Sequence, residues 1–248
     1  TYGIWVAGQG TSAENKKTII QADGTVDIRA ELKNQGDSGA LSTAGIYVQG
    51  ASPNQDTEIT GSRVTISATG KADKGILDTY GIYISTGSNI SIGTSEAESE
   101  AEEPTLVIGA TSSADKTSYG SIGIKGFNAA SSDNIITIEN KNGSTSIFGE
   151  DTKGKNGYGI SLTALSSAYS GKSIGTINSK KGTTVFGTSS AVVLDNSSSL
   201  SVTAEAGDNR FTSKNDIAVK ITGGDGFLAE AAGYTNTITS EKGSGLMV

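Results

Sequence analysis

The sequence predicts an all-β protein folded as a right-handed, three-sided parallel β-helix of about seven to eight coils of irregular length. Three observations point to this fold class. A five-residue phrase recurs along the 248 residues, shorter strand-like segments follow it in a fixed order, and the composition favours turns. Repeats roughly 20–50 residues apart are typical of solenoids, in which each coil buries its apolar stripe against its neighbours.

The recurring phrase combines a polar or aromatic residue, a small residue, and then an apolar, a variable and an apolar residue. Such alternation is typical of strands, because successive side chains leave opposite faces of the backbone. The small residue suits a corner where a Cβ atom would crowd the neighbouring coil. We expect the first apolar residues to stack in one internal column. The copies are Tyr2–Val6, Ala44–Val48, Tyr80–Ile84, Gly120–Ile124, Tyr158–Leu162, Ser190–Leu194, Asn215–Val219 and Ser244–Val248, with first apolar residues Ile4, Ile46, Ile82, Ile122, Ile160, Val192, Ile217 and Leu246.

The spacing of these first apolar residues is irregular. It ranges from 25 residues, between Val192 and Ile217, to 42 residues, between Ile4 and Ile46. The strands therefore repeat while the loops between them vary in length. This combination indicates a β-solenoid rather than a propeller.

Each repeat continues with two further strand-like segments separated by a tight turn. In the fourth repeat these are Asn134–Ile138 and Ser144–Gly149, joined by Lys141–Gly143. Asn-Gly and Lys-Gly pairs adopt the left-handed conformations that such turns need. Each coil is therefore predicted as strand, variable loop, strand, tight turn, strand. The other copies are Thr18–Ile20 with Thr25–Arg29, Glu58–Ile59 with Arg63–Ser67, Asn89–Ile92 with Thr105–Ile108, Ile174–Ile177 with Thr183–Gly187, Leu200–Thr203 with Arg210–Thr212, and Asn236–Thr239, which begins the same pattern in the seventh repeat.

The composition agrees with this fold and disfavours several partners. The chain has 34 Gly, 2 Pro and 34% hydrophobic residues, which is low for a globule but sufficient for a thin internal stripe. The formal charge of −7 disfavours nucleic acid and anionic membranes as partners, because both are bound through clustered Lys and Arg. No apolar run approaches the length of a membrane span, so we expect no membrane insertion by this segment.

Histidine and cysteine do not occur in the sequence. Catalysis by Ser-His-Asp or Cys-His and the common zinc sites are therefore excluded. Isolated acids such as Asp73, Asp78 and Asp195 are predicted as turn or cap residues rather than as paired catalytic carboxylates. We expect a protein that is not an enzyme, with no catalytic residues, no cofactor and no metal.

Two groups of residues are candidates for binding. Trp5, Tyr47 and Tyr83 occupy the outward place of three successive phrases, where aromatic rings suit a sugar or a protein partner. The alternative is a cross-strand stack that only stabilises the sheet. We expect this column to end with Gly123 and Ser161, which would confine a binding platform to the first three coils.

The second candidate group is an acidic stretch in the third repeat. Its charges are predicted to form a solvated loop, or alternatively a recognition loop that faces a basic partner. Its candidate residues are Glu96, Glu98, Glu100, Glu102 and Glu103.

Several segments together resemble a known family. The Gly-Ile-Tyr-Val phrase at Gly45–Val48, the Asn-x-Ile-Thr-Ile strand at Asn134–Ile138 and the Gly-x-x-x-Phe-Gly segment at Gly182–Gly187 resemble the passenger domain of a type V (classical) autotransporter. Such passenger domains are bacterial surface proteins and often adhesins. The resemblance implies that residues 1–248 are one β-helical segment of a longer protein, with a signal peptide and an outer-membrane translocator barrel outside it. It also offers a reason for the lack of cysteine, because a disulfide would hinder passage through a narrow pore.

The expected function is therefore that of a non-enzymatic adhesin at the bacterial cell surface, whose loops or outer face bind a protein or glycan of a host or bacterial cell. One alternative is a structural stalk that associates with copies of itself through Ser/Thr/Asn-rich faces. A polysaccharide-cleaving enzyme is the other alternative, because some parallel β-helices carry converging carboxylates on one outer face.

Overall fold

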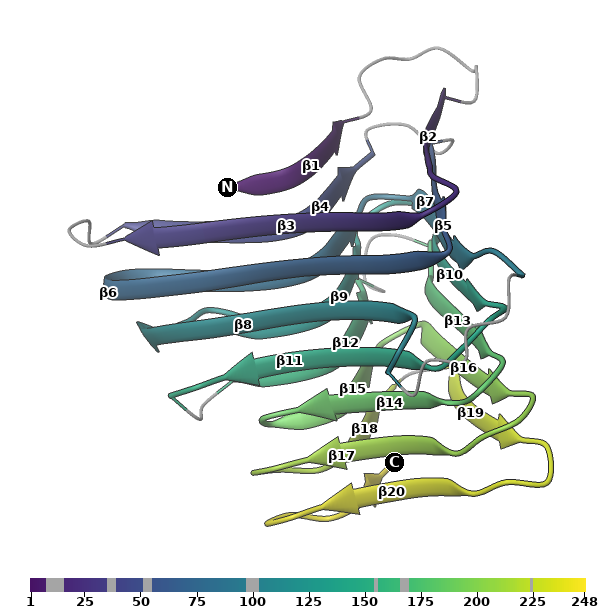
Figure 1. The fold of residues 1–248 in the computed structure, drawn as a ribbon. Coiled ribbons are helices and arrows are strands. Elements are labelled where there is room, and N and C mark those ends of the chain that lie inside the picture. The colour runs from purple at the N-terminus through teal and green to yellow at the C-terminus, as the bar shows by residue number, and fades with distance from the viewer. Residues whose placement is uncertain are drawn as a thin grey trace.

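In the computed structural model, the chain forms a rod of stacked parallel strands (Figure 1). The structure describes residues 1–7, 16–34, 39–50, 55–96, 103–153, 156–165, 170–223 and 225–248. Within these ranges the strands form a 14-stranded and a 7-stranded sheet, and every strand pairing is parallel. Neighbouring strands come from successive repeats, so the predicted parallel β-helix is confirmed.

Three stacks of strands make the three sides of the rod. The signature face contains the recurring phrase and consists of β1 (Tyr2–Ala7), β4 (Ala40–Gln49), the second half of β6 (Arg63–Ser85), β9 (Ser121–Asn128), β12 (Gly157–Ala164), β15 (Ser190–Asp195), β18 (Val219–Thr222) and β21 (Leu246–Met247). The second face consists of β2 (Lys16–Gln21), β5 (Gln55–Gly61), β7 (Ser88–Thr94), β10 (Asn134–Asn140), β13 (Ser173–Ser179), β16 (Ser198–Ala204) and β19 (Gly226–Ala231). The third face consists of β3 (Thr25–Asn34), the first half of β6, β8 (Leu106–Lys116), β11 (Thr145–Asp151), β14 (Thr183–Gly187), β17 (Asn209–Ser213) and β20 (Asn236–Ser240).

Aliphatic side chains stack in a column inside the signature face. Ile46, Ile82 and Ile124 lie in register and are almost fully buried. Burying one such side chain stabilises the fold by roughly 1.5–3 kcal/mol, so the complete column contributes much of the folding free energy. The column consists of Ile4, Ile46, Ile82, Ile124, Ile160, Val192 and Val219, and the register continues to Leu246, which is exposed.

Two members predicted for this column were wrong by two residues. Ile122 pairs with Tyr80 instead of Ile82, and Val219 instead of Ile217 pairs with Val192. Ile122 packs with Ala44 and Tyr80 in a separate outer cluster. A shift of two residues preserves the alternation between the faces of a strand, so the hydrophobic pattern alone did not fix the register.

The small residue before each column member is required by close packing. A Cβ atom on Gly81 would lie 2.5 Å from the backbone oxygen of Gly123 in the next coil. The predicted reason for a small residue at the corner is thereby confirmed. The same place is occupied by Gly3, Gly45, Gly81, Gly123, Gly159, Ala191 and Ala218.

The early coils extend beyond the rod through unusually long strands. The sequence pattern predicted a short strand at Arg63–Ser67, but β6 runs without a break for 23 residues and joins the third face to the signature face. Gly75, with a φ of 88°, lies within this strand. A small second core fills the extension and consists of Leu32, Leu41, Ala72, Leu77 and Ala114. Asp78, the residue after Leu77, lies beside the turn that precedes β9 in the next coil.

The last repeat also differs from the prediction. Asn236–Thr239 was predicted to begin the strand pattern after the phrase, but it belongs to β20 and pairs with β17 on the third face. The preceding strand of that coil is β19, which pairs with β16. Leu228 and Glu230 lie on the exposed side of β19, while Phe227 and Ala229 pack against the internal core.

In the described part of the chain, no helix has the length and apolar character that crossing a membrane requires.

Candidate functional site

Aromatic side chains form a column on the outer side of the signature face. Trp5 lies in register with Tyr47, and Tyr47 with Tyr83. The rings of Tyr47 and Tyr83 are stacked with centroids 4.8 Å apart, and Tyr2 tilts against Trp5 and Tyr47. Trp5, on the first strand β1, is 61% exposed.

The middle of the aromatic column is stabilised by a buried tyrosine, Tyr80. Tyr80 packs against Tyr83 with ring centroids 5.0 Å apart and is itself buried. Burial raises the pKa of Tyr83 to about 12 and raises the pKa of Tyr80 further in the same direction. Both phenols are therefore neutral at physiological pH. The predicted cross-strand stack is confirmed, and a role in binding stays a prediction.

Lys125 is the next residue of the outward column. The prediction that Gly123 takes this place was wrong, because Tyr83 lies in register with Lys125, and Lys125 with Ser161. The column thus passes from aromatic side chains to a lysine and then to a small hydroxyl side chain. The loss of large rings after Tyr83 leaves space on the face of the later coils.

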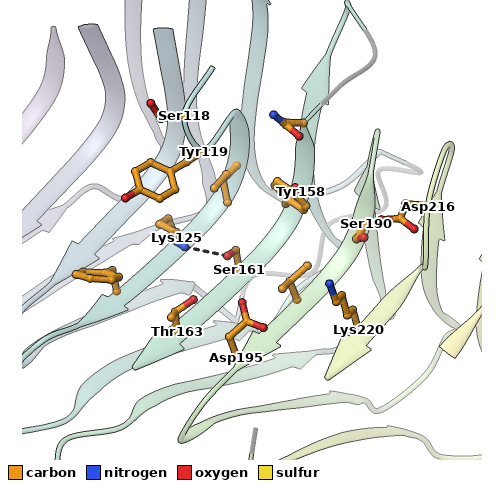
Figure 2. A pocket seen from close by; sticks show the side chains of 14 residues that line it. Ser118, Tyr119, Lys125, Tyr158, Ser161, Thr163, Ser190, Asp195, Asp216 and Lys220 are labelled. Carbon is orange, nitrogen blue, oxygen red and sulfur yellow. Dashed lines mark hydrogen bonds between the residues drawn. The ribbon is translucent and has the colours of Figure 1, made fainter. Parts of the chain in front are cut away.

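A pocket of about 380 Å³ occupies that space (Figure 2). Ile122, Phe127 and Val193 supply its apolar lining. Its polar lining comes from five neighbouring segments of the signature face. These are the turn before β9, then β9, β12 and β15, and finally β18 with the residues just before it. The polar residues on which the site depends are Lys125, Ser161, Ser190, Asp195, Asp216 and Lys220.

Lys125 is part of the pocket lining. Its side chain points toward Ser161 (Figure 2), and Nζ donates a hydrogen bond to Oγ of Ser161 at 3.1 Å. The residue is only 7% exposed, and among the described residues no carboxylate lies within ion-pair distance of Nζ. Burial lowers the pKa of Lys125 to about 8, while the more distant carboxylates of Asp195 and Asp78 act in the opposite direction.

A short turn covers one side of this amine. The ring centroid of Tyr119 lies 5.6 Å from Nζ of Lys125, within the range of a cation–π interaction. The turn is held by Asp78, whose Oδ1 accepts hydrogen bonds from the backbone N–H groups of Ser118, Tyr119 and Gly120 at 2.8–2.9 Å. Successive backbone N–H groups of this kind form a favourable site for an anion.

Gly120 and Asn156 fix the other end of the turn. Gly120 has a φ of 96°, and a Cβ atom there would lie 2.0 Å from the backbone oxygen of Asn156. The Asn156 side chain donates a hydrogen bond to Oγ1 of Thr117 at 3.0 Å. The turn that carries Tyr119 is therefore tied to the coils on both sides. The prediction that Asp78 is a cap residue is confirmed by its three backbone partners.

The remaining charges lie around the pocket. Asp195 and Lys220 come from β15 and β18, and Asp216 lies just before β18. Burial, and then the negative charge of Asp216, raise the pKa of Tyr158. Two amines, two carboxylates, several hydroxyl groups and two phenol rings thus surround one cavity, which suits a small ligand that is both polar and apolar.

The two described ends of the acidic stretch, Glu96 and Glu103, lie elsewhere on the rod. Glu96 follows β7 on the second face and Glu103 precedes β8 on the third face, so neither of them lies with the aromatic column. Glu96 pairs with Lys141 at 3.4 Å and Glu103 pairs with Arg63 at 3.3 Å, both as exposed ion pairs that contribute little to stability. The candidates Glu98, Glu100 and Glu102 lie outside the described residues.

Within the described ranges, no group of three or more His, Cys, Asp or Glu residues is placed to hold a metal ion. The pocket itself was missed at the level of sequence, because Lys125 falls two residues away from the outward place that the pattern assigned. The signal that could have found it is the Gly-Ile-Lys-Gly phrase at Gly123–Gly126, which puts a lysine where earlier copies have an aromatic residue.

Comparisons with protein-family models, with curated proteins and with solved structures give no match to this chain, so the site is interpreted from its own geometry.

Proposed function

We propose that this chain is a non-enzymatic adhesin, a rigid β-helical rod that binds a protein or glycan of a host or bacterial cell surface. The observation that carries the proposal is the continuous outer path on the signature face, from the exposed ring of Trp5 through Tyr47 and Tyr83 to the pocket around Lys125. The placement at the bacterial surface rests on the sequence resemblance to autotransporter passenger domains.

The chemistry of this path favours a glycan over other partners. Aromatic rings offer flat apolar surfaces against which a sugar can stack, and the polar groups beyond them can bind its hydroxyl groups. Parallel strands hold these side chains at the regular spacing of the coils, so little conformational entropy is lost when an extended chain binds along the rod. Binding along the signature face also leaves the second face free.

The proposal is tested by binding of the whole chain to cells and to arrays of glycans and matrix proteins. We expect saturable binding that the Trp5→Ala variant weakens. Trp5 is the only tryptophan of the sequence, so a ligand that covers it shifts its fluorescence emission to shorter wavelength. Because Trp5 is largely exposed, its replacement leaves the fold intact.

Leu228→Ala is the matched control. Leu228 is an exposed large apolar residue on the second face, so this variant retains binding if the signature face is the binding surface. Equal loss in both variants, or no saturable binding to any surface, would contradict the proposal. Release of unsaturated products from a uronate polymer would show instead that the protein is an enzyme.

Self-association is the second candidate, and the second face favours it. Ser91, Thr137, Thr176 and Ser201 lie in register as an outward column of small hydroxyl side chains. A flat polar surface of this kind can pair with a second copy through many hydrogen bonds. Sedimentation that shows only monomer at high protein concentration would exclude it.

A further inference from the structure

We infer that the pocket around Lys125 binds a carboxylate-bearing sugar residue, with the Lys125 amine as the group that receives the carboxylate. The inference deepens the proposed adhesin function, on which it rests, by assigning a ligand class to one site. The inference starts from the amine of Lys125, which has more hydrogen-bond donors than hydrogen-bond partners. Lys125 has three N–H donors when charged, and within the described part of the chain it has one hydroxyl partner and one aromatic ring.

A buried ammonium group favours an anion at this place. A charge that is removed from water is costly unless another charge or several hydrogen bonds compensate for it. Asp195 and Asp78 act on the amine only from a distance. The amine faces a cavity that is large enough for one or two sugar rings, and a ligand carboxylate there would supply the missing charge-assisted hydrogen bond.

The other groups of the pocket distinguish a sugar acid from a phosphate or a polyanion. The carboxylates of Asp195 and Asp216 would repel a ligand that carries two or more negative charges. The same carboxylates can accept hydrogen bonds from sugar hydroxyl groups. One carboxylate together with several hydroxyl groups therefore fits this distribution of charge better than a phosphate group does.

The flanking rings fit the apolar side of a sugar. Tyr119 and Tyr158 come from different segments and both line the cavity (Figure 2). Asp78 binds the backbone N–H of Tyr119, so the turn from which this ring extends is fixed before a ligand arrives, while the ring itself is 57% exposed. A rigid site of this kind loses little entropy on binding.

The test is a titration of the whole chain with galacturonic acid and with galactose, followed by nuclear magnetic resonance. These sugars differ only in the carboxylate that replaces a hydroxymethyl group. We expect the acid to bind about tenfold or more tightly, which is the effect of one hydrogen bond to a charged group. N-acetylneuraminic acid serves as a parallel arm that distinguishes a uronic acid from a sialic acid as the source of the carboxylate.

The Lys125→Met variant keeps the length of the side chain and removes its charge. We expect it to lose the preference for the acid while its thermal stability stays equal or rises, because no charge is buried any more. A merely structural lysine would not produce this combination. The Lys125→Arg variant should retain part of the preference, and Lys71→Met, which removes an exposed lysine outside the pocket lining, should retain all of it.

The pH dependence gives a second measurement. From about pH 7 to about pH 9 the preference for the acid should fall, because Lys125 loses its proton there while the sugar carboxylate stays ionised. The charged or titratable groups around Lys125 come from every element that borders the pocket. They are Asp78 and Tyr83 on β6, Tyr119 in the turn, Tyr158 on β12, Asp195 on β15, and Asp216 and Lys220 just before and within β18.

Equal affinities for the acid and the neutral sugar, or a preference that survives in Lys125→Met, would overturn the inference. If cells or glycan arrays still bind the chain under those outcomes, the adhesin function stands and only the ligand assignment fails. If neither sugar acids nor any surface bind, the function fails as well.

Discussion

Lys125 lowers the folding stability at neutral pH. Its pKa falls from 10.5 to about 8 on folding, and this difference corresponds to about 3 kcal/mol of unfavourable free energy at pH values below 8. Between about pH 8 and pH 10 the unfolded chain keeps a proton that the folded chain has released. Stability therefore rises with pH over this interval.

The Lys125→Met variant should abolish this rise. We expect the free energy of unfolding of the original chain to increase from about pH 8 to about pH 10, and that of the variant to stay nearly constant. Buried phenols such as Tyr83 have a raised pKa, so they lower stability only above about pH 10 and in both proteins alike. Urea denaturation at several pH values measures the difference. Parallel pH profiles would contradict the assignment of a buried amine.

Asp78 organises the turn that carries Tyr119. Replacing it with alanine removes the acceptor of three backbone N–H groups, so we expect Asp78→Ala to lower the free energy of unfolding by about 2 kcal/mol. Asp78→Asn keeps one acceptor oxygen and should lose less. Asp73 is exposed in the same strand, and Asp73→Ala should change stability by less than about 0.5 kcal/mol. Equal effects at Asp78 and Asp73 in denaturant titrations would show that the turn does not depend on this carboxylate.

At the scale of the strand, the signature face depends on small residues at its corner. Ala at position 81 would bring a methyl group against the backbone of the next coil. We expect Gly81→Ala to destabilise the fold by about 1–3 kcal/mol, because the neighbouring coil must move to make room. Gly24 is the control, since nothing lies within 4 Å of the place where its Cβ would be. Gly24→Ala should be neutral or slightly stabilising in the same denaturation experiment.

The strands differ in how far the sequence could predict them. Period-two alternation was sufficient for the three-sided architecture, since inward and outward places follow directly from it. The alternation could not decide whether Ile122 or Ile124 stacks on Ile82, because both registers keep apolar side chains inward and small residues nearby. Only pairing across coils, Ile82 with Ile124 and Tyr83 with Lys125, resolves that choice. The binding pocket depends on this register, so it could not be predicted from one strand at a time.

Other parts of the site depend on contacts between distant segments. The turn over the pocket is fixed by a residue 40 positions earlier, the distance in sequence between Asp78 and Ser118. The local sequence Ser118-Tyr119-Gly120 predicts a turn but not its acceptor. The long strand β6 was missed for a similar reason, because its outer half is stabilised by a small core that three coils build together.

At the scale of the whole molecule, the rod separates stability from binding. The internal column couples each coil to the next, while the outer faces carry different chemistry: rings and a pocket on the signature face, hydroxyl groups on the second face. Substitutions on an outer face can therefore change a ligand without affecting the column. This arrangement also means that an inward substitution in one coil affects the coils on both sides.

Adjacent residues of β13 allow a test of this coupling. Ile177 is inward and almost fully buried, whereas Thr176 is outward and half-buried. We expect Ile177→Asp to lower the free energy of unfolding by about 4 kcal/mol or more, because a carboxylate would be buried without a partner. Since each coil depends on its neighbours, the thermal transition followed by circular dichroism should also broaden or divide into two steps. Thr176→Asp adds the same charge one residue away and should leave a single transition with a small shift. Similar melting curves for the two variants would mean that the column does not couple the coils, and that each coil is stabilised mainly by its own strands and turns.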